Sequence, residues 1–152
     1  MGDLGSRTLD CSFSHHVGVT RSLTLKPETS AAPLPAWPIP ASTHDLLEAA
    51  VAGAAEKIGL NTTVLYCGEL IDAFDALVIV SGRNAPQVRA IAEEIERLGQ
   101  LEGRKTLREE GWSDGRWVAL DYGDVIVHVF EEEAREYYDL EHLWSAAPTY
   151  RP

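Results

Sequence analysis

The stretch that decides the fold is Arg116-Trp-Val-Ala-Leu-Asp-Tyr-Gly-Asp-Val-Ile-Val-His-Val-Phe130. It holds two runs of alternating residues, rich in β-branched side chains, that meet at Tyr122-Gly123. Such runs joined by a two-residue link containing glycine predict a β-hairpin. Because successive side chains of a strand point to opposite faces, one face of this hairpin is apolar and belongs to the core, and it carries Val118, Leu120, Val125, Val127 and Val129.

The other face of the hairpin is expected to meet a partner. With the turn at Tyr122-Gly123, Trp117 lies opposite His128 and Asp121 lies opposite Asp124. Like charges directly opposite each other cost roughly 0.2–1 kcal/mol. The two aspartates therefore either serve the turn or await a cation. His128 beside a carboxylate is a candidate general base, but a histidine stacked on Trp117 as a structural residue fits better, because no nucleophile accompanies it.

An acidic and aromatic segment follows the hairpin. Glu131–Glu141 contains six acids and only Arg135 as a base. Acids in the first turn of a helix interact favourably with its dipole, which accounts for the first three but not for the later ones. Two readings stay open for the apolar side chains here: they seal the sheet, or they form an interface with an acidic rim for a basic partner. These side chains are Tyr137, Tyr138, Leu140, Leu143 and Trp144.

The remaining pattern predicts an α/β fold with a mixed β-sheet of about five strands and packed helices. Ala76–Ser81 is almost entirely apolar, as in a central strand covered on both faces. Apolar residues at helical spacing predict helices over 42–59, 85–98 and 131–138, and the remaining strands are expected at 61–67 and 106–110.

Residues 42–148 are predicted to be one domain, between a leader (1–41) and a tail (149–152). Residues 1–40 contain five prolines and balanced charges, so they are expected to form a disordered leader without core, or to follow from a mis-chosen start codon. An organelle transit peptide is the alternative, which the acids of this segment argue against. We expect removal of the leader to leave thermal stability unchanged.

The charge of the domain narrows the class of partner. The chain has a net charge of −11, and residues 41–152 carry all of it. Nucleic-acid affinity depends mostly on Lys and Arg that neutralise phosphates, so no direct DNA contact is expected and a basic protein is the natural partner. Cys11 and Cys67 are far apart and Cys67 is expected to be a buried thiol, which fits a cytoplasmic protein. No cofactor, metal or membrane span is expected.

The chain from Ser42 to Pro148 resembles the ribosomal silencing factor (RsfS), or Iojap, family. The resemblance rests on Gly115-Arg-Trp117, Asp121–Phe130 and the acidic helix that ends in Tyr138-Asp-Leu-Glu-His-Leu-Trp144. Upstream, Leu77-Val-Ile-Val-Ser-Gly82 also matches. The resemblance implies a nucleotidyltransferase-like layout of sheet and helices.

The resemblance also implies a function. Members bind the large ribosomal subunit through the ribosomal protein of universal family fourteen, block joining of the small subunit, and so repress translation under nutrient limitation. The implied state is a monomer on the ribosome, with a homodimer as an alternative for the free protein. We predict a non-enzymatic contact surface of Trp117, Asp121, Tyr122, Asp124, His128, Phe130, Tyr138 and Trp144.

The competing hypothesis is a nucleotidyltransferase-like enzyme or a nucleotide sensor. It would use Ser81-Gly82 at the end of a central strand, where open α/β sheets bind ligands, together with Asp121 and Asp124. Such enzymes need two acids at alternate positions of one strand to hold Mg²⁺. Since Asp121 and Asp124 do not have that spacing, the binding module is the preferred reading.

Overall fold

The computed structural model describes residues 32–152, and expectations about residues 1–31 lie outside this part. The elements follow the order α3 (Ala41–Glu56), β1 (Leu60–Tyr66), β2 (Ala76–Gly82), α4 (Ala85–Leu101), β3 (Arg108–Glu110), β4 (Trp117–Asp121), β5 (Val125–Glu131), α5 (Glu132–Tyr138), α6 (Leu140–Leu143) and β6 (Thr149–Tyr150). The strands form one sheet in the order β3-β4-β5-β2-β1-β6. β2 and β5 are parallel and the other neighbours are antiparallel. The predicted α/β class with a mixed sheet is confirmed.

The sheet has six strands because Thr149–Tyr150, expected to be tail, pairs with β1 as β6. Two residues give no periodicity from which a strand could be read. Among the helices within residues 32–152, none is long and apolar enough to span a membrane.

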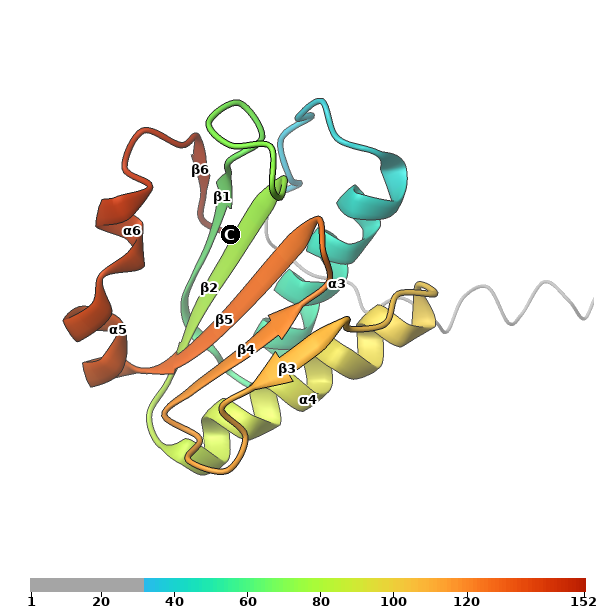
Figure 1. The fold of residues 1–152 in the computed structure, drawn as a ribbon. Helices are drawn as coiled ribbons and strands as arrows, with labels where there is room; N and C mark the ends of the chain where they lie inside the picture. The colour runs from blue at the N-terminus through green and yellow to red at the C-terminus, as the bar shows by residue number, and fades with distance from the viewer. Residues whose placement is uncertain (1–31) are drawn as a thin grey trace, which may run out of the picture. The chain divides into compact units, whose positions relative to one another are not determined.

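The two faces of the sheet are covered differently (Figure 1). α3 and α4 pack on one face and form the larger core cluster with apolar side chains of β1, β2, β4 and β5. α5 and α6 contribute to a smaller cluster on the opposite face, with side chains of β1, β2 and β5. Cys67 is fully buried there, as expected, and burial raises the pKa of its thiol to about 11. On this opposite face, no helix of the described residues covers β4 or the part of β5 that precedes Phe130.

Both long helices differ at their ends from the sequence expectation. α3 begins at Ala41 after Pro40, without a side-chain cap. Thr43, in the first turn of this helix, is buried and donates its hydroxyl to Asp124. α4 is capped by Asn84, which accepts from the backbone N–H of Gln87 at 2.9 Å. It continues past Gly99 to Leu101.

Gly99 is a packing position inside α4, so the prediction that this helix ends at residue 98 is wrong. A Cβ at Gly99 would lie 3.1 Å from the Tyr122 hydroxyl. The glycine therefore lets the hairpin approach α4 closely.

The hairpin forms, but its turn lies one residue later than predicted, so each residue of β4 pairs with a partner two residues further along β5. Tyr122 N–H donates to the Val125 carbonyl at 2.9 Å, so Gly123 and Asp124 occupy the turn. Gly123 has φ +94°, a conformation that glycine adopts without strain. Trp117 consequently pairs with Phe130 rather than His128, and Asp121 pairs with Ile126 rather than Asp124. The predicted apolar face is correct, because a two-residue change of pairing keeps the same side chains on each face of the hairpin.

Residues 32–40 pack on the domain, contrary to the expectation that the whole leader contributes no core. Leu34, Trp37 and Ile39 are partly buried against the larger core cluster. The Trp37 ring stacks on Tyr66 with centroids 5.4 Å apart, and the Tyr150 hydroxyl donates to the Ala32 carbonyl. Proline fixes the backbone of this segment but does not prevent its apolar side chains from being buried.

We expect Trp37→Ala to lower the free energy of unfolding by about 2 kcal/mol, below the cost of truncating a fully buried tryptophan because Trp37 is only partly buried. Deletion of residues 1–40 removes Trp37 together with Leu34 and Ile39, so it should lower the melting temperature at least as much as Trp37→Ala does. The matched control is deletion of residues 1–31, which leaves every described contact between residues 32–40 and the rest of the domain in place. Urea and thermal unfolding test this, and equal melting temperatures for the two deletions would contradict it.

A pair of carboxyl groups connects α4 to the edge strand β3. Glu109 accepts hydrogen bonds from Thr106 Oγ1 at 2.6 Å and Trp112 Nε1 at 2.9 Å. The bonds from Thr106, Glu96 and Trp112 lower the pKa of Glu109. The pKa of Glu96 is raised to about 7. The main cause is the hydrogen bond that Glu96 makes with Glu109, followed by burial and by the negative charges of Glu109 and Glu93. Glu96 is therefore the protonated partner that donates to the Glu109 carboxylate.

This pair predicts that stability falls as pH rises through neutrality. Below the ordinary glutamate pKa of 4.5, Glu96 is protonated in both the folded and unfolded chain, and its contribution is fully present. Between 4.5 and about 7 only the folded chain keeps the proton, so the free energy of unfolding decreases with rising pH.

Glu96→Gln should abolish this component, because its amide donates to Glu109 at every pH. Urea unfolding at pH 5 and pH 8 measures the difference between variant and wild type. We expect wild type to lose stability relative to Glu96→Gln over this interval. Parallel pH dependences in the two proteins would refute the shared proton.

Candidate functional site

The uncovered part of the sheet forms the candidate site, here called the open sheet face: Trp117, Ala119 and Asp121 of β4 with Ile126 and His128 of β5. All five side chains are half-buried. They share one face because they alternate with the buried residues of both strands. α5 borders this face at the end where Trp117 lies.

Aromatic rings join the open sheet face to α5. Trp117 stacks on the buried ring of Phe130, with centroids 4.8 Å apart, and lies 4.7 Å from the ring of Tyr138. Tyr137 meets Tyr138 edge to face at 5.0 Å. Tyr137 and Tyr138 remain 81% and 51% exposed. Four of the predicted site residues, Trp117, His128, Phe130 and Tyr138, are thus brought together, with Phe130 supporting the others from below.

His128 is held as a neutral ring with a defined orientation. Trp117 Nε1–H donates to His128 Nδ1 at 3.0 Å. Burial lowers the pKa of His128 to about 4, so the imidazole is uncharged at neutral pH. With Nδ1 as acceptor, the proton of the neutral ring resides on Nε2. His128 therefore offers a hydrogen-bond donor, not a positive charge.

The structure separates Asp121, Asp124 and Tyr122. Asp121 accepts from the N–H of Gly123 at 2.8 Å and serves the turn, one of the two roles left open for it. Asp124 does not lie opposite Asp121: it binds Thr43 and Arg104, each at 2.5 Å, on the side of α3 and α4. Burial alone would raise the pKa of Asp124, but the hydrogen bonds from Thr43 and Arg104 outweigh it and lower that pKa. Tyr122 is buried in the larger core cluster.

Trp144 lies apart from the aromatic cluster, in the smaller core cluster. Its ring meets Phe74 edge to face, with centroids 5.4 Å apart. The first of the two readings, that these side chains seal the sheet, holds for Trp144, and the interface reading stays a prediction. Trp144 helps to seal the sheet, while Leu143 is exposed.

Arg135 is a residue whose role sequence reasoning missed. It donates to Ser81 Oγ at 2.9 Å, to Thr63 Oγ1 at 3.1 Å and from Nε to Glu141 at 3.1 Å. Its side chain is 11% exposed. The sequence contained one signal for this role, because Arg135 is the single basic residue of the acidic run Glu131–Glu141. These contacts fix α5 on β1 and β2 and so position its tyrosines beside Trp117.

The geometry does not assemble the hypothetical nucleotide site. Ser81 is buried, and its hydroxyl accepts the bond from Arg135. A ligand would have to displace that arginine. Ser81 pairs with Phe130 and Asp121 pairs with Ile126, so the two parts are offset by about 13 Å along the strands, at roughly 3.3 Å per residue, and β5 lies between them. Within residues 32–152, no group of three or more His, Cys, Asp or Glu side chains could hold a metal ion.

Comparison with known proteins identifies the family. Residues 40–151 match the model of RsfS, described as ribosomal silencing factor during starvation. The chain belongs to this family. It is 39% identical over 108 residues to the ribosomal silencing factor RsfS of Halalkalibacterium halodurans, covering 71% of this chain and 92% of that protein. It is 30% identical over 138 residues to an Iojap-related mitochondrial protein of Arabidopsis thaliana, covering 84% and 74%.

The RsfS fold is confirmed by solved structures. A crystal structure of a Chromobacterium violaceum protein has a TM-score of 0.64 and 30% sequence identity, and the likeness covers 66% of this chain and 83% of that one. Membership assigns the chain to ribosome silencing and translation regulation. The relatives are named as silencing factors, which fits a protein without catalytic activity.

Proposed function

We propose that this protein binds the large ribosomal subunit in the cytoplasm through the basic ribosomal protein of universal family fourteen. Bound there as a monomer, it sterically blocks joining of the small subunit and represses translation when nutrients are scarce. RsfS membership supports the role. The observation that carries the contact surface is the contact between the half-buried ring of Trp117 and the exposed ring of Tyr138, beside the acidic α5.

This surface has the anatomy of a protein interface. Large aromatic side chains dominate interface energetics, and Trp117 is supported by Phe130 so that it is already oriented before binding. Preorganisation reduces the entropy lost on association. His128 adds one donor of fixed direction next to Trp117. Asp121 lies on the same face, whereas Asp124 and Tyr122 support the hairpin from the other side.

A steric mechanism needs affinity and position, and no bond is made or broken. The experiment mixes purified large and small subunits with increasing protein and measures their joining by light scattering. We expect joining to fall in proportion to the large subunits occupied, and pelleting should retain the protein with large but not small subunits. Undiminished joining with large subunits fully occupied would refute the blocking mechanism.

The acids of α5 should act mainly on the rate of association. Glu132 and Glu136 are exposed, and exposed charges steer a partner of opposite sign without adding much to the final contact. We expect Glu132→Gln with Glu136→Gln to slow association with large subunits about tenfold at low salt, and hardly at all at high salt, where such charges are screened. Stopped-flow measurements across a salt series test this. The prediction fails if the variant and wild type differ equally at every salt concentration.

A further inference from the structure

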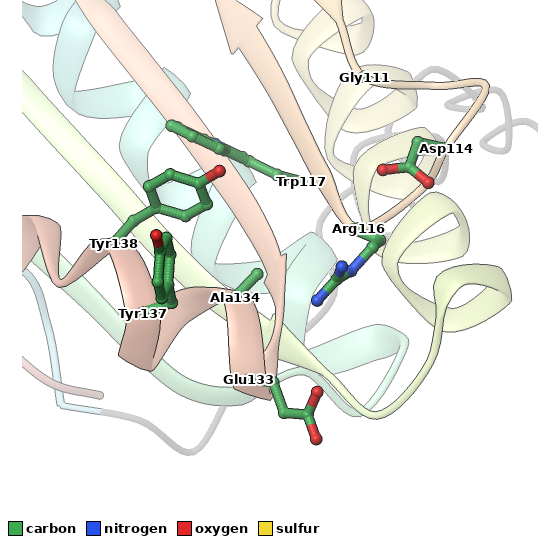
Figure 2. Close-up of a pocket in the computed structure, with 8 residues that line it drawn as sticks. All are labelled: Gly111, Asp114, Arg116, Trp117, Glu133, Ala134, Tyr137 and Tyr138. Carbon is green, nitrogen blue, oxygen red and sulfur yellow. The ribbon is translucent and has the colours of Figure 1, made fainter.

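A pocket of about 540 Å³ opens between α5 and the loop that precedes β4 (Figure 2). Trp117, Tyr137 and Tyr138 supply aromatic lining, and Asp114, Arg116 and Glu133 supply charged groups. Figure 2 shows the two tyrosines side by side on α5, with Trp117 beyond Tyr138 and the charged groups around the other side. The pocket adjoins the open sheet face through Trp117.

Both walls of the pocket are fixed by contacts that do not depend on a partner. On the loop side, Arg89 donates from Nε to the Trp112 carbonyl and from Nη2 to the Ser113 carbonyl, each at 2.8 Å. Gly111 in the same loop has φ +93°, and a Cβ there would lie 1.9 Å from the Trp117 carbonyl oxygen. On the helix side, Arg135 anchors α5 to β1 and β2. The pocket is therefore preformed.

Tyr137 lines the pocket but contributes little to the packing of the domain. Tyr137 is 81% exposed, and its ring contact is with Tyr138. An exposed ring at the edge of a preformed pocket is common where a partner binds, since aromatic residues are enriched in interfaces. The side of Tyr137 turned to solvent remains available to an occupant.

The charges of the pocket select a cation. Arg116 is not free, because its Nε donates to Glu131 at 3.1 Å. The carboxylates of Asp114 and Glu133 bond to no other side chain within the described residues. Counting the Arg116–Glu131 pair and Arg89, which is bound to the loop wall, three carboxylates stand against two guanidinium groups. A cation near the faces of tyrosine and tryptophan is also attracted by their π-electrons.

We propose that this pocket receives a single lysine or arginine side chain of the protein partner. The identity of that partner rests on the proposed function, but the chemistry of the pocket does not. The aliphatic stem of the occupant lies against Trp117 and the tyrosines, and its charged end reaches Asp114 and Glu133. The pocket thus adds recognition of one basic residue to the larger aromatic surface.

A small probe tests the pocket without the ribosome. The full chain, labelled with ¹⁵N, is titrated with Nα-acetyl-lysine amide while the indole N–H signal of Trp117 is followed by NMR. The signal is assigned with Trp117→Phe. We expect a saturable shift that Nα-acetyl-arginine amide reproduces. Nα-acetyl-norleucine amide, which has an aliphatic chain without the charge, should bind about tenfold more weakly, as the loss of a cation–π contact and ion pairing predicts.

Matched variants locate the effect. Tyr137→Ala and Glu133→Gln should each weaken the lysine probe about five- to tenfold, whereas Glu132→Gln, which removes the same charge outside the pocket lining, should not. Melting temperatures near wild type verify folding, which is expected because the substituted side chains are exposed. Equal binding of the norleucine and lysine probes, or preference for Nα-acetyl-glutamate amide, would overturn the proposal.

Pelleting with large subunits separates a failure of the pocket proposal from a failure of the proposed function. If wild type pellets with large subunits and Tyr137→Ala binds them equally well, the pocket does not take a basic residue of that partner and this inference is wrong. If the lysine probe binds as expected but the wild-type protein does not pellet with large subunits, the proposed function falls and the specificity of the pocket stands.

Discussion

Trp117→Ala is expected to weaken binding to the large ribosomal subunit at least thirtyfold, the loss associated with an interface hot spot of about 2 kcal/mol or more. Trp117 contacts Phe130, Tyr138 and His128 at once. Its removal eliminates the largest ring of the open sheet face and frees His128 from its orienting hydrogen bond. Pelleting with large subunits, followed by the joining assay, measures the effect.

Stability must be separated from binding in this variant. The alanine also opens space above Phe130, and because Trp117 is only half-buried we expect a smaller loss of unfolding free energy than the roughly 3–5 kcal/mol of a fully buried tryptophan. Trp117→Phe is the matched control, since it keeps an aromatic ring and loses the bond to His128. Its binding should lie between wild type and alanine. If Trp117→Ala remains folded and still blocks joining at wild-type concentrations, the contact surface lies elsewhere.

Asp124→Ala is expected to destabilise the domain by about 2–3 kcal/mol, less than the roughly 3–5 kcal/mol for breaking a fully buried ion pair, because Asp124 retains some solvent access. The substitution leaves the buried Thr43 hydroxyl without its acceptor and Arg104 without its carboxylate partner. These bonds connect the hairpin turn to α3 and to the segment after α4. Urea unfolding measures the loss.

Asp121→Ala is the matched control, because within residues 32–152 the Asp121 carboxylate makes a single hydrogen bond, which it accepts from the Gly123 N–H. We expect it to cost no more than about 1 kcal/mol, the usual net value of one hydrogen bond. Equal destabilisation by the two substitutions would mean that the Thr43 and Arg104 contacts contribute little in solution.

The pH dependence of Asp124 has the opposite sign to that of Glu96. Its pKa is lowered in the folded chain, so its stabilising contribution is present above the ordinary aspartate pKa of 3.8 and is lost as pH falls through the folded value. The difference in stability between wild type and Asp124→Ala should therefore shrink in acid. A constant difference down to acid pH would indicate that charge plays no part in the Asp124 contacts.

Local patterns determined which elements form and which face of each strand is apolar. Val118, Leu120, Val127 and Val129 were assigned correctly to the core, because alternation along a strand depends only on the neighbouring residues. The RsfS resemblance was read from contiguous residues around the hairpin and is confirmed by the family match. Trp117, His128, Phe130 and Tyr138 were selected from the same short segment and do meet in one cluster.

The choice of partner for each side chain was not determined locally. Asp121 and Asp124 are three residues apart and chemically alike, yet one caps the turn and the other binds Thr43, 81 positions earlier in the chain. Arg135 looked like one base in an acidic helix, but it reaches Ser81 and Thr63. Such contacts follow from the packing of helices on the sheet, which brings distant residues together.

The sequence by itself therefore determined the α/β class, the hairpin with its apolar face, and the family, since each depends on spacing within a short segment. Only the tertiary structure decided that Tyr122 and Asp124 face the helices, that Trp37 joins the core, and that Trp117 and Tyr137 line one pocket. The physical reason is that a buried polar group needs a hydrogen-bonding partner and an apolar side chain needs a surface to cover. Both are supplied by residues far away in the sequence.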